Sequence, residues 1–232
     1  MLFSDSNIAR FISENFEPVW ESVRPVPTVR IDFGNGRVVT RTLHGNIATY
    51  ICSADGQVLD ILPGIYDPAT YADQLQQLSL LAKFVANYAP GSRGTVLASY
   101  HSRQASHLSE QKQPDRFVLT EIPKALKDMT KARIERPALI LLRPVPGPAG
   151  PVSKNGPAES AAANLLETDS HFNETVRRQQ IHAYLAQAGQ VTPPDLTKWL
   201  YRDVLHSDLD DPYLGLGETL FSSYPFPEKV VR

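Results

Sequence analysis

Cysteine is nearly missing from this chain, which holds a single one, Cys52, among its 232 residues. One cysteine excludes an internal disulfide, a dithiol redox cycle within the chain and any metal site built from several cysteines. Long apolar runs are also missing, because no stretch reaches the ~18 residues that a membrane span needs. The N-terminus carries no basic-then-apolar signal segment. We therefore expect a protein without a membrane span that is cytoplasmic by default, and exported only if its native start lies upstream of Met1.

An excess of charge of one sign is missing too, since the formal net charge is −2. Domains that bind nucleic acid usually carry a basic surplus, so this balance argues against nucleic acid as a partner. The chain is 42% hydrophobic and 21% charged, which is typical of a globular protein with one or two domains. A chain of this length can bury a substantial core.

The motifs of hydrolytic, nucleotide-binding and metal chemistry are absent from the sequence. It has no G-x-S-x-G motif, and Gly215-Leu216-Gly217 is not followed by the lysine and helix of a phosphate loop. No two histidines stand four residues apart, as they do on the helix of a zinc protease. Asp208 does not begin an EF-hand loop, because the sixth and twelfth positions would be Tyr213 and Thr219. We expect no catalytic residue, no metal and no cofactor, and on balance no enzyme.

A hairpin followed by a helix is the clearest pattern that the sequence contains. Residues 47–52 and 58–62 are short apolar runs on either side of the turn-forming residues 54–56. Asp67 is suited to cap a helix, and Pro68 to its first position, where a missing N–H costs nothing. Apolar residues then recur at helical spacing, which predicts a helix to about residue 88 that packs on the hairpin.

This hairpin and helix resemble the C-terminal half of the thioredoxin fold, whose last strands read as Pro-Thr, an apolar run, a polar turn and a closing glycine. Thr49, residues 50–52, Asp55-Gly56 and Gly64 occupy those places here. The resemblance covers about residues 1–90 and implies that one loop faces a substrate or partner. The residues of this candidate loop are His44, Asn46, Ile47, Ala48 and Thr49.

The N-terminal segment is similar to the part of thioredoxin-like proteins that follows the C-x-x-C turn. Ser4 or Asp5 is expected to cap a short helix with an apolar face formed by Ile8, Phe11 and Ile12. A strand is expected to begin with Phe16, Val19 and Trp20.

The chain also departs from the thioredoxin pattern at three places. The C-x-x-C motif is absent. Ala48 stands where the family has a cis-proline, so a trans peptide bond is expected. Residues 28–43 read as a second hairpin with a turn at residues 34–36, whereas the family has a helix there.

The remainder of the chain divides at a segment rich in proline and glycine, residues 143–163, which reads as a linker. Before it we expect a helix over residues 96–108, a strand at 117–119, a basic amphipathic helix at 122–136 and a buried strand at 138–142. After it, two helices and an aromatic tail form a small C-terminal unit, which is too small to bury much on its own and should dock elsewhere. The apolar residues of the two helices are Phe172, Val176, Ile181, Tyr184, Leu185, Ala188, Leu196, Trp199, Leu200 and Val204.

The sequence thus predicts an α+β fold: a divergent thioredoxin-like domain at residues 1–142, a linker at 143–163 and a helical unit at 164–232. The function expected is that of a non-catalytic interaction module, with another protein or a second copy as its partner. The alternative is an N-terminally short form of a thiol-disulfide oxidoreductase whose C-x-x-C lies upstream of Met1. A single-thiol enzyme using Cys52 ranks last, because the strand pattern predicts that this cysteine is buried.

Overall fold

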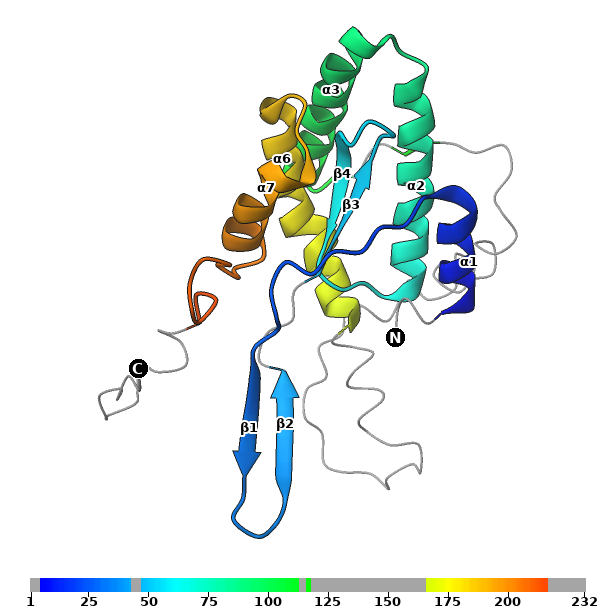
Figure 1. The fold of residues 1–232 in the computed structure, drawn as a ribbon. Coiled ribbons are helices and arrows are strands. Elements are labelled where there is room, and N and C mark those ends of the chain that lie inside the picture. Colours follow the sequence, from blue (N-terminus) through cyan, green and yellow to red (C-terminus); the bar gives the residue numbers. More distant parts are fainter. Residues whose placement is uncertain (1–4, 43–46, 113–115, 118–165, 217–232) are drawn as a thin grey trace, which may run out of the picture.

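The computed structural model describes residues 5–42, 47–112, 116–117 and 166–216. They form a mixed α+β structure of helices and two small antiparallel sheets (Figure 1). No helix in this part of the chain is long and apolar enough to cross a membrane. The elements predicted at residues 118–142, the linker, the tail beyond residue 216, and His44 and Asn46 lie outside the described residues.

The centre of the fold is the predicted hairpin, which the structure confirms. Strands β3 (Ala48–Cys52) and β4 (Val58–Pro63) pair antiparallel, with Thr49 opposite Leu62. Gly56 closes the turn at φ +81°, a backbone conformation that glycine adopts without steric cost. All of β4 is buried, so both faces of the hairpin are covered by other elements.

Helices α1 (Ser6–Asn15) and α2 (Pro68–Ala86) cover one face of the hairpin. Asp5 caps α1 by accepting hydrogen bonds from two backbone amides, and Asp67 caps α2 by accepting one from Thr70, as predicted. Tyr71 of α2 also contacts Thr49 of β3 through a hydroxyl pair at 3.0 Å. The first core consists of Ile8, Phe11, Ile51, Leu59, Leu62, Tyr66, Tyr71, Ala72, Leu75, Leu78, Leu81, Val85 and Tyr100.

Helices from the C-terminal part of the chain cover the opposite face, as the two sides of the hairpin in Figure 1 show. They are α6 (Arg178–Ala188), α7 (Pro193–Trp199) and the π-helical turn η3 (Leu200–Val204). Helix α3 (Pro90–Ser109) packs along α6. The second core consists of Val58, Ile61, Ile181, Leu185, Leu196, Leu200, Tyr201, Val204 and Leu205.

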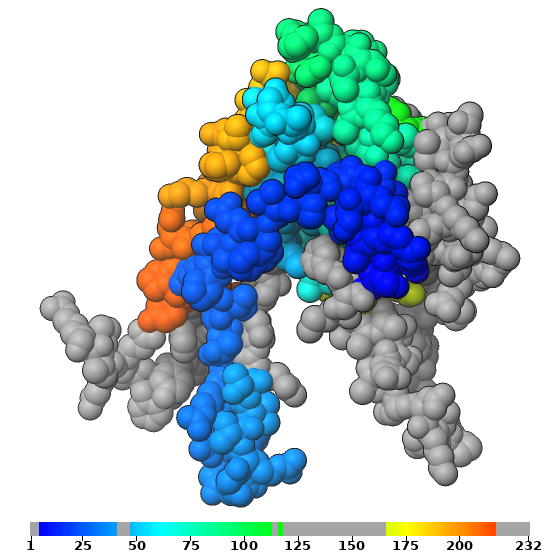
Figure 2. All heavy atoms as spheres, turned by 45° about the vertical axis from the view of Figure 1, so that its right-hand side comes forward, coloured from blue at the N-terminus to red at the C-terminus, as the bar shows by residue number. Residues whose placement is uncertain are grey.

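The second predicted hairpin is also present, and it projects from the body as an arm (Figures 1 and 2). Strands β1 (Thr28–Asp32) and β2 (Val38–Thr42) pair antiparallel over their whole length. Gly34 and Gly36, at φ +69° and +81°, make the turn. We call residues 28–42 the arm. Its base is held by Arg24, whose guanidinium donates to the carbonyl oxygens of Leu209, Asp211 and Pro212.

The strand predicted to begin at Phe16 is not formed, and this prediction was wrong. Among the described residues the central sheet has two strands and neither pairs with this segment, while Pro18 lacks the N–H that a ladder needs. Phe16 packs on the first core instead. Val19 and Trp20 are 90% and 86% exposed.

The C-terminal helix has a different buried face from the one predicted. Residues 166–188 are helical throughout, but a π-helical turn, η2 (Asn173–Arg177), interrupts the α-helical geometry. A π turn holds an extra residue, and it therefore rotates the next part of the helix about the helix axis. Phe172, Val176 and Tyr184 are exposed, and the buried side chains include Asn173, Arg178, Ile181, His182 and Leu185.

Cys52 is exposed, so the prediction that it is buried was wrong. The pairing register shifts between Ile51 and Cys52, and Cys52 pairs with Val58 at the end of β3, while Ile51 enters the first core. The protein around the thiol still removes part of its hydration, and this desolvation raises the pKa of Cys52.

Candidate functional site

A charged side chain lies in the middle of the most buried strand. Asp60 of β4 is fully buried between apolar neighbours, and an isolated carboxylate in such a place is very costly. Its Oδ2 accepts a hydrogen bond from Arg178 Nη2 at 2.9 Å, and its Oδ1 accepts one from the Ile61 amide at 2.8 Å. Burial by itself raises the pKa of Asp60, but Arg178 and two nearby histidines outweigh it and hold that pKa below its usual value. Asp60 is therefore ionised and paired.

Arg178 reaches Asp60 from the first residue of α6, directly after the π turn. Its guanidinium also points to the Ile61 carbonyl at 3.5 Å and to His182 Nε2 at 3.2 Å. The Glu174 carboxylate lies 4.0 Å from Nε. Burial lowers the pKa of Arg178, but the acidic groups around it, first among them the carboxylates of Asp60 and Glu174, together raise it by more than burial lowers it. The net shift of the pKa is therefore upward. Arg178 thus remains a cation although only 5% of the residue is exposed.

Two buried histidines continue this network from α6 to α3. His182 Nδ1 lies 2.9 Å from His101 Nδ1, and His101 Nε2 lies 3.0 Å from the Leu59 carbonyl oxygen. An arginine only donates, so His182 Nε2 must accept and carry no proton. A neutral His182 then has its proton on Nδ1 and donates it to His101 Nδ1. His101 keeps its own proton on Nε2 and donates it to Leu59.

These contacts assign one tautomer to each ring. We call the sequence Arg178, His182, His101 and the Leu59 carbonyl the relay. Desolvation lowers the pKa of both histidines, His182 more strongly, and the cation of Arg178 adds to this while Asp60 opposes it. Both rings are therefore neutral at neutral pH, as the relay requires.

Tyrosine and amide side chains enclose the network. Tyr66 is fully buried, and its burial together with the Glu174 carboxylate raises its pKa well above the ordinary value. Tyr100 lies edge-on to both imidazoles, with ring centroids 5.0 Å from His101 and 5.9 Å from His182. Glu174 also accepts a hydrogen bond from Gln74 of α2. The network thereby connects β4, α2, α3 and α6.

The π turn fits closely against the end of β4. Asn173 Nδ2 donates to the Ile65 carbonyl at 2.8 Å, and Arg177 Nη1 donates to Asn173 Oδ1 at 2.8 Å. Gly64 lies beneath this pair at φ +76°, and a Cβ there would stand 2.9–3.0 Å from Asn173 and Arg177. The glycine therefore allows the helix to approach the strand.

Asp60, His101 and His182 are also close enough to be considered as metal ligands, since their candidate ligand atoms lie within 4.8 Å of one another. The arrangement does not fit a metal ion. The lone pair of His101 Nδ1 already receives the proton of His182 Nδ1. A metal would have to break this contact and would place a second cation beside Arg178 in a medium where charges interact strongly. We interpret the cluster as a hydrogen-bonded network.

The described residues of the loop predicted from the sequence, Ile47, Ala48 and Thr49, each make a different contact within the fold. The Ile47 carbonyl accepts a hydrogen bond from the Gly64 amide at 2.6 Å, and Ala48 packs against the second core. Thr49 is bonded to Tyr71. The sequence interpretation missed Asp60, Arg178 and the histidine pair. One signal was available, because an aspartate interrupts an otherwise apolar strand.

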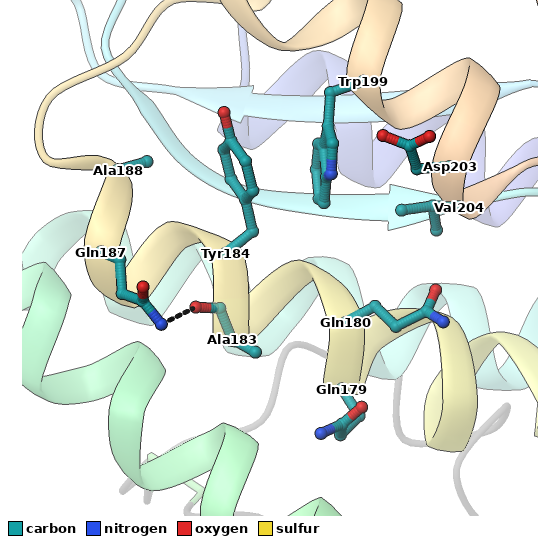
Figure 3. A pocket seen from close by; sticks show the side chains of 9 residues that line it. All are labelled: Gln179, Gln180, Ala183, Tyr184, Gln187, Ala188, Trp199, Asp203 and Val204. Atoms are coloured by element: carbon teal, nitrogen blue, oxygen red, sulfur yellow. Dashed lines mark hydrogen bonds between the residues drawn. The ribbon is translucent and has the colours of Figure 1, made fainter.

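A shallow groove of about 600 Å³ lies between α6 and the α7–η3 segment (Figure 3). The rings of Tyr184 and Trp199 stack on each other with centroids 3.9 Å apart. Asp203 is the charged residue of the lining, and its Oδ1 accepts a hydrogen bond from Arg202 Nε at 2.8 Å. The remaining lining residues are Gln179, Gln180, Ala183, Gln187, Ala188 and Val204.

The arm presents a different surface, with one apolar face. Pairing and alternation place Val29, Ile31, Phe33 and Val39 on one side of the arm, together with Arg37, which lies opposite Phe33. Ile31 and Phe33 are 42% and 60% exposed. The opposite side carries Arg30, Asp32, Val38 and Thr40, of which Val38 is 42% exposed, so the first side is the more apolar of the two.

Comparisons of the chain with protein-family models, with curated proteins and with solved structures found no match.

Proposed function

We propose that this protein is a non-catalytic protein-interaction module, and that the arm with the preceding residues Val19 and Trp20 is its binding surface. The observation that carries the proposal is the exposure of apolar side chains on an element that stands clear of both cores (Figure 2). Apolar side chains that gather in water on one element typically mark an interaction site.

The physics of a two-stranded sheet supports a partner on this surface. A single hairpin is marginally stable in water, and it gains stability when its apolar face is covered. Both of its strands are edge strands, so their outward N–H and C=O groups are available for an added strand. The base of the arm is anchored through Arg24, which presents the arm in one direction.

The partner we propose is an extended apolar protein segment with an acidic residue near the tip of the arm. Arg37 lies opposite Phe33, where the Phe33 amide donates to the Arg37 carbonyl at 3.1 Å, and both side chains are exposed. Asp32 uses its carboxylate to accept from the Gly34 amide at 2.9 Å within the turn. A cation at the edge of an apolar face favours an acidic group on the partner.

We also propose that the body is of the divergent thioredoxin-like type. The order of hairpin and covering helix, the position of Thr49 in β3 and the turn at Gly56 support this. The oxidoreductase alternative depends on a dithiol upstream of Met1, and nothing in the described residues favours it. The raised pKa of Cys52 reduces the thiolate fraction that a single-thiol enzyme using this residue would need.

A photo-crosslinking amino acid in place of Phe33 tests the proposed function. The matched control carries it in place of Ile65, which is 46% exposed on the body. We expect a protein cross-linked from position 33 and not from position 65. The purified cross-linked protein should then bind the wild-type chain, and Phe33→Ser should weaken that binding at least about tenfold, as at an interface anchor, whereas Ile65→Ser should not.

Equal cross-linking from both positions, or none from position 33, contradicts the proposal. Cross-links from position 33 could instead join only two copies of this chain. The arm would then still be an interaction surface, but its partner would be a second copy, and the proposal of a separate partner with an acidic residue would be wrong.

A further inference from the structure

We propose that the relay is an acid-sensitive switch, which holds residues 166–216 against β4 and α3 at neutral pH and releases them when its two histidines are protonated. This goes beyond the proposed function and depends on a different part of the molecule, because no residue of the arm takes part.

The geometry of the relay leaves no place for another proton. Each of its three contacts already contains one hydrogen, from Arg178 to His182, from His182 to His101 and from His101 to Leu59. A proton added to His101 Nδ1 would face the proton of His182 at 2.9 Å. A proton added to His182 Nε2 would face the guanidinium of Arg178 at 3.2 Å. Either addition turns an attractive contact into a repulsive one.

The charges around the histidines decide whether the folded network tolerates such a proton. Asp60 lies 4.0 Å from His182 and favours protonation, while Arg178 and the removal of both rings from water oppose it. The opposing effects are larger, because the pKa of each histidine lies below its ordinary value. The titratable and charged groups that face the pair are Asp60 of β4, Tyr66 of the following loop, Tyr100 of α3, and Glu174 and Arg178 of the C-terminal helix.

The two cores make the release local. The first core, with α1 and α2, contains no residue beyond Phe117 among those described. The second core and the relay bring α6, α7 and η3 onto β4 and α3. Loss of the relay therefore weakens the attachment of the C-terminal helices while the first core keeps its own contacts.

Hydrogen exchange of the full-length chain, followed by mass spectrometry between about pH 7.5 and pH 5, tests the switch in the range where histidine titrates. After correction for intrinsic exchange rates, protection of residues 178–204 should fall as pH decreases below about 6.5. The protection factor of these residues should decrease by up to about a hundredfold per pH unit if the opening of the C-terminal helices takes up two protons. Protection of α2 should stay nearly constant.

His182→Asn keeps a donor toward His101 and removes one titrating group. In this variant the protection factor should therefore decrease by at most about tenfold per pH unit. His101→Gln, which keeps a donor toward Leu59, gives the same expectation and replaces the first variant if that does not fold. His171→Asn is the matched control, because His171 is exposed on the same helix, and its profile should equal the wild type.

Three results would overturn the switch. One is protection of residues 178–204 that does not depend on pH. The second is equal loss of protection in α2, which would mean global unfolding. The third is an unchanged slope in the histidine variants.

Discussion

Asp60 of β4 and Arg178 of α6 stand 118 positions apart in the sequence and form a 2.9 Å ion pair in the interior of the protein. Both side chains are nearly inaccessible to water. This pair is the electrostatic contact through which the C-terminal helix is joined to the central hairpin.

Removal of one partner should be far more damaging than removal of both. Arg178→Met leaves the Asp60 carboxylate buried without its cation and should lower the free energy of unfolding by about 3–5 kcal/mol, measured by urea denaturation. The double variant Asp60→Leu with Arg178→Met should recover much of that loss. Lys198→Met removes the exposed pair with Asp210 and should leave the midpoint unchanged. Equal losses in the single and double variants would show that the charges are not coupled.

The stability of the protein should fall on acidification in two separate windows. The histidines have lowered folded pKa values, so their contribution is present above about pH 6.5 and is lost as pH decreases. The folded pKa of Asp60 is also lowered, so its contribution is lost only below about pH 4. Thermal midpoints measured against pH should therefore show two steps. Asp60→Asn should remove much of the lower step and leave the upper one, and loss of the upper step instead would contradict this assignment.

Gly64→Ala should destabilise the protein by more than about 1 kcal/mol, because alanine is strained at positive φ and its Cβ would meet the π turn. Gly56→Ala, in the turn of the central hairpin, has a similar backbone strain at φ +81° but open space around the new Cβ. The difference between the two midpoints in urea therefore measures the contact with Asn173 and Arg177. Equal effects would mean that the π turn yields to the methyl group.

The thiol of Cys52 should react completely with a disulfide reagent in the native protein, because it is exposed. Its raised pKa keeps the thiolate fraction small at neutral pH, so labelling should be slow there and accelerate as pH increases. The chain should not reduce insulin disulfides, since one thiol does not complete a dithiol cycle. Labelling that requires denaturant, or reductase activity that Cys52→Ser abolishes, would contradict these expectations.

Zinc should not stabilise the protein. Binding at Asp60, His101 and His182 would have to displace the proton between the two rings and repel Arg178. The thermal midpoint should be the same with a small excess of Zn²⁺ and with a chelator. If zinc raises the thermal midpoint and His182→Asn abolishes this rise, the cluster is a metal site and the relay is wrong.

Some parts of the fold could be predicted because their signals are local in the chain. Both hairpins, the helices that begin after Asp5 and Asp67, and the helix that begins after Thr192 all depend on residues within a few positions of one another. In the last case Asp195 accepts from the Thr192 amide at 2.9 Å, which is the contact of a capping box. Caps and glycine turns are satisfied by the same short segment that contains them.

The tertiary structure alone decided the features that depend on distant partners. The π turn at Asn173 fits the approach to Gly64, and in the helix that follows it Arg178 and His182 are buried beside the expected Ile181 and Leu185. The exposure of Cys52 follows from a register shift against β4, and that of Trp20 from the lack of a neighbouring strand. Asp60 has no cationic partner within its own strand. Its burial is tolerated because a cation 118 positions away lies beside it, and the pattern of one segment carries no information about such a contact.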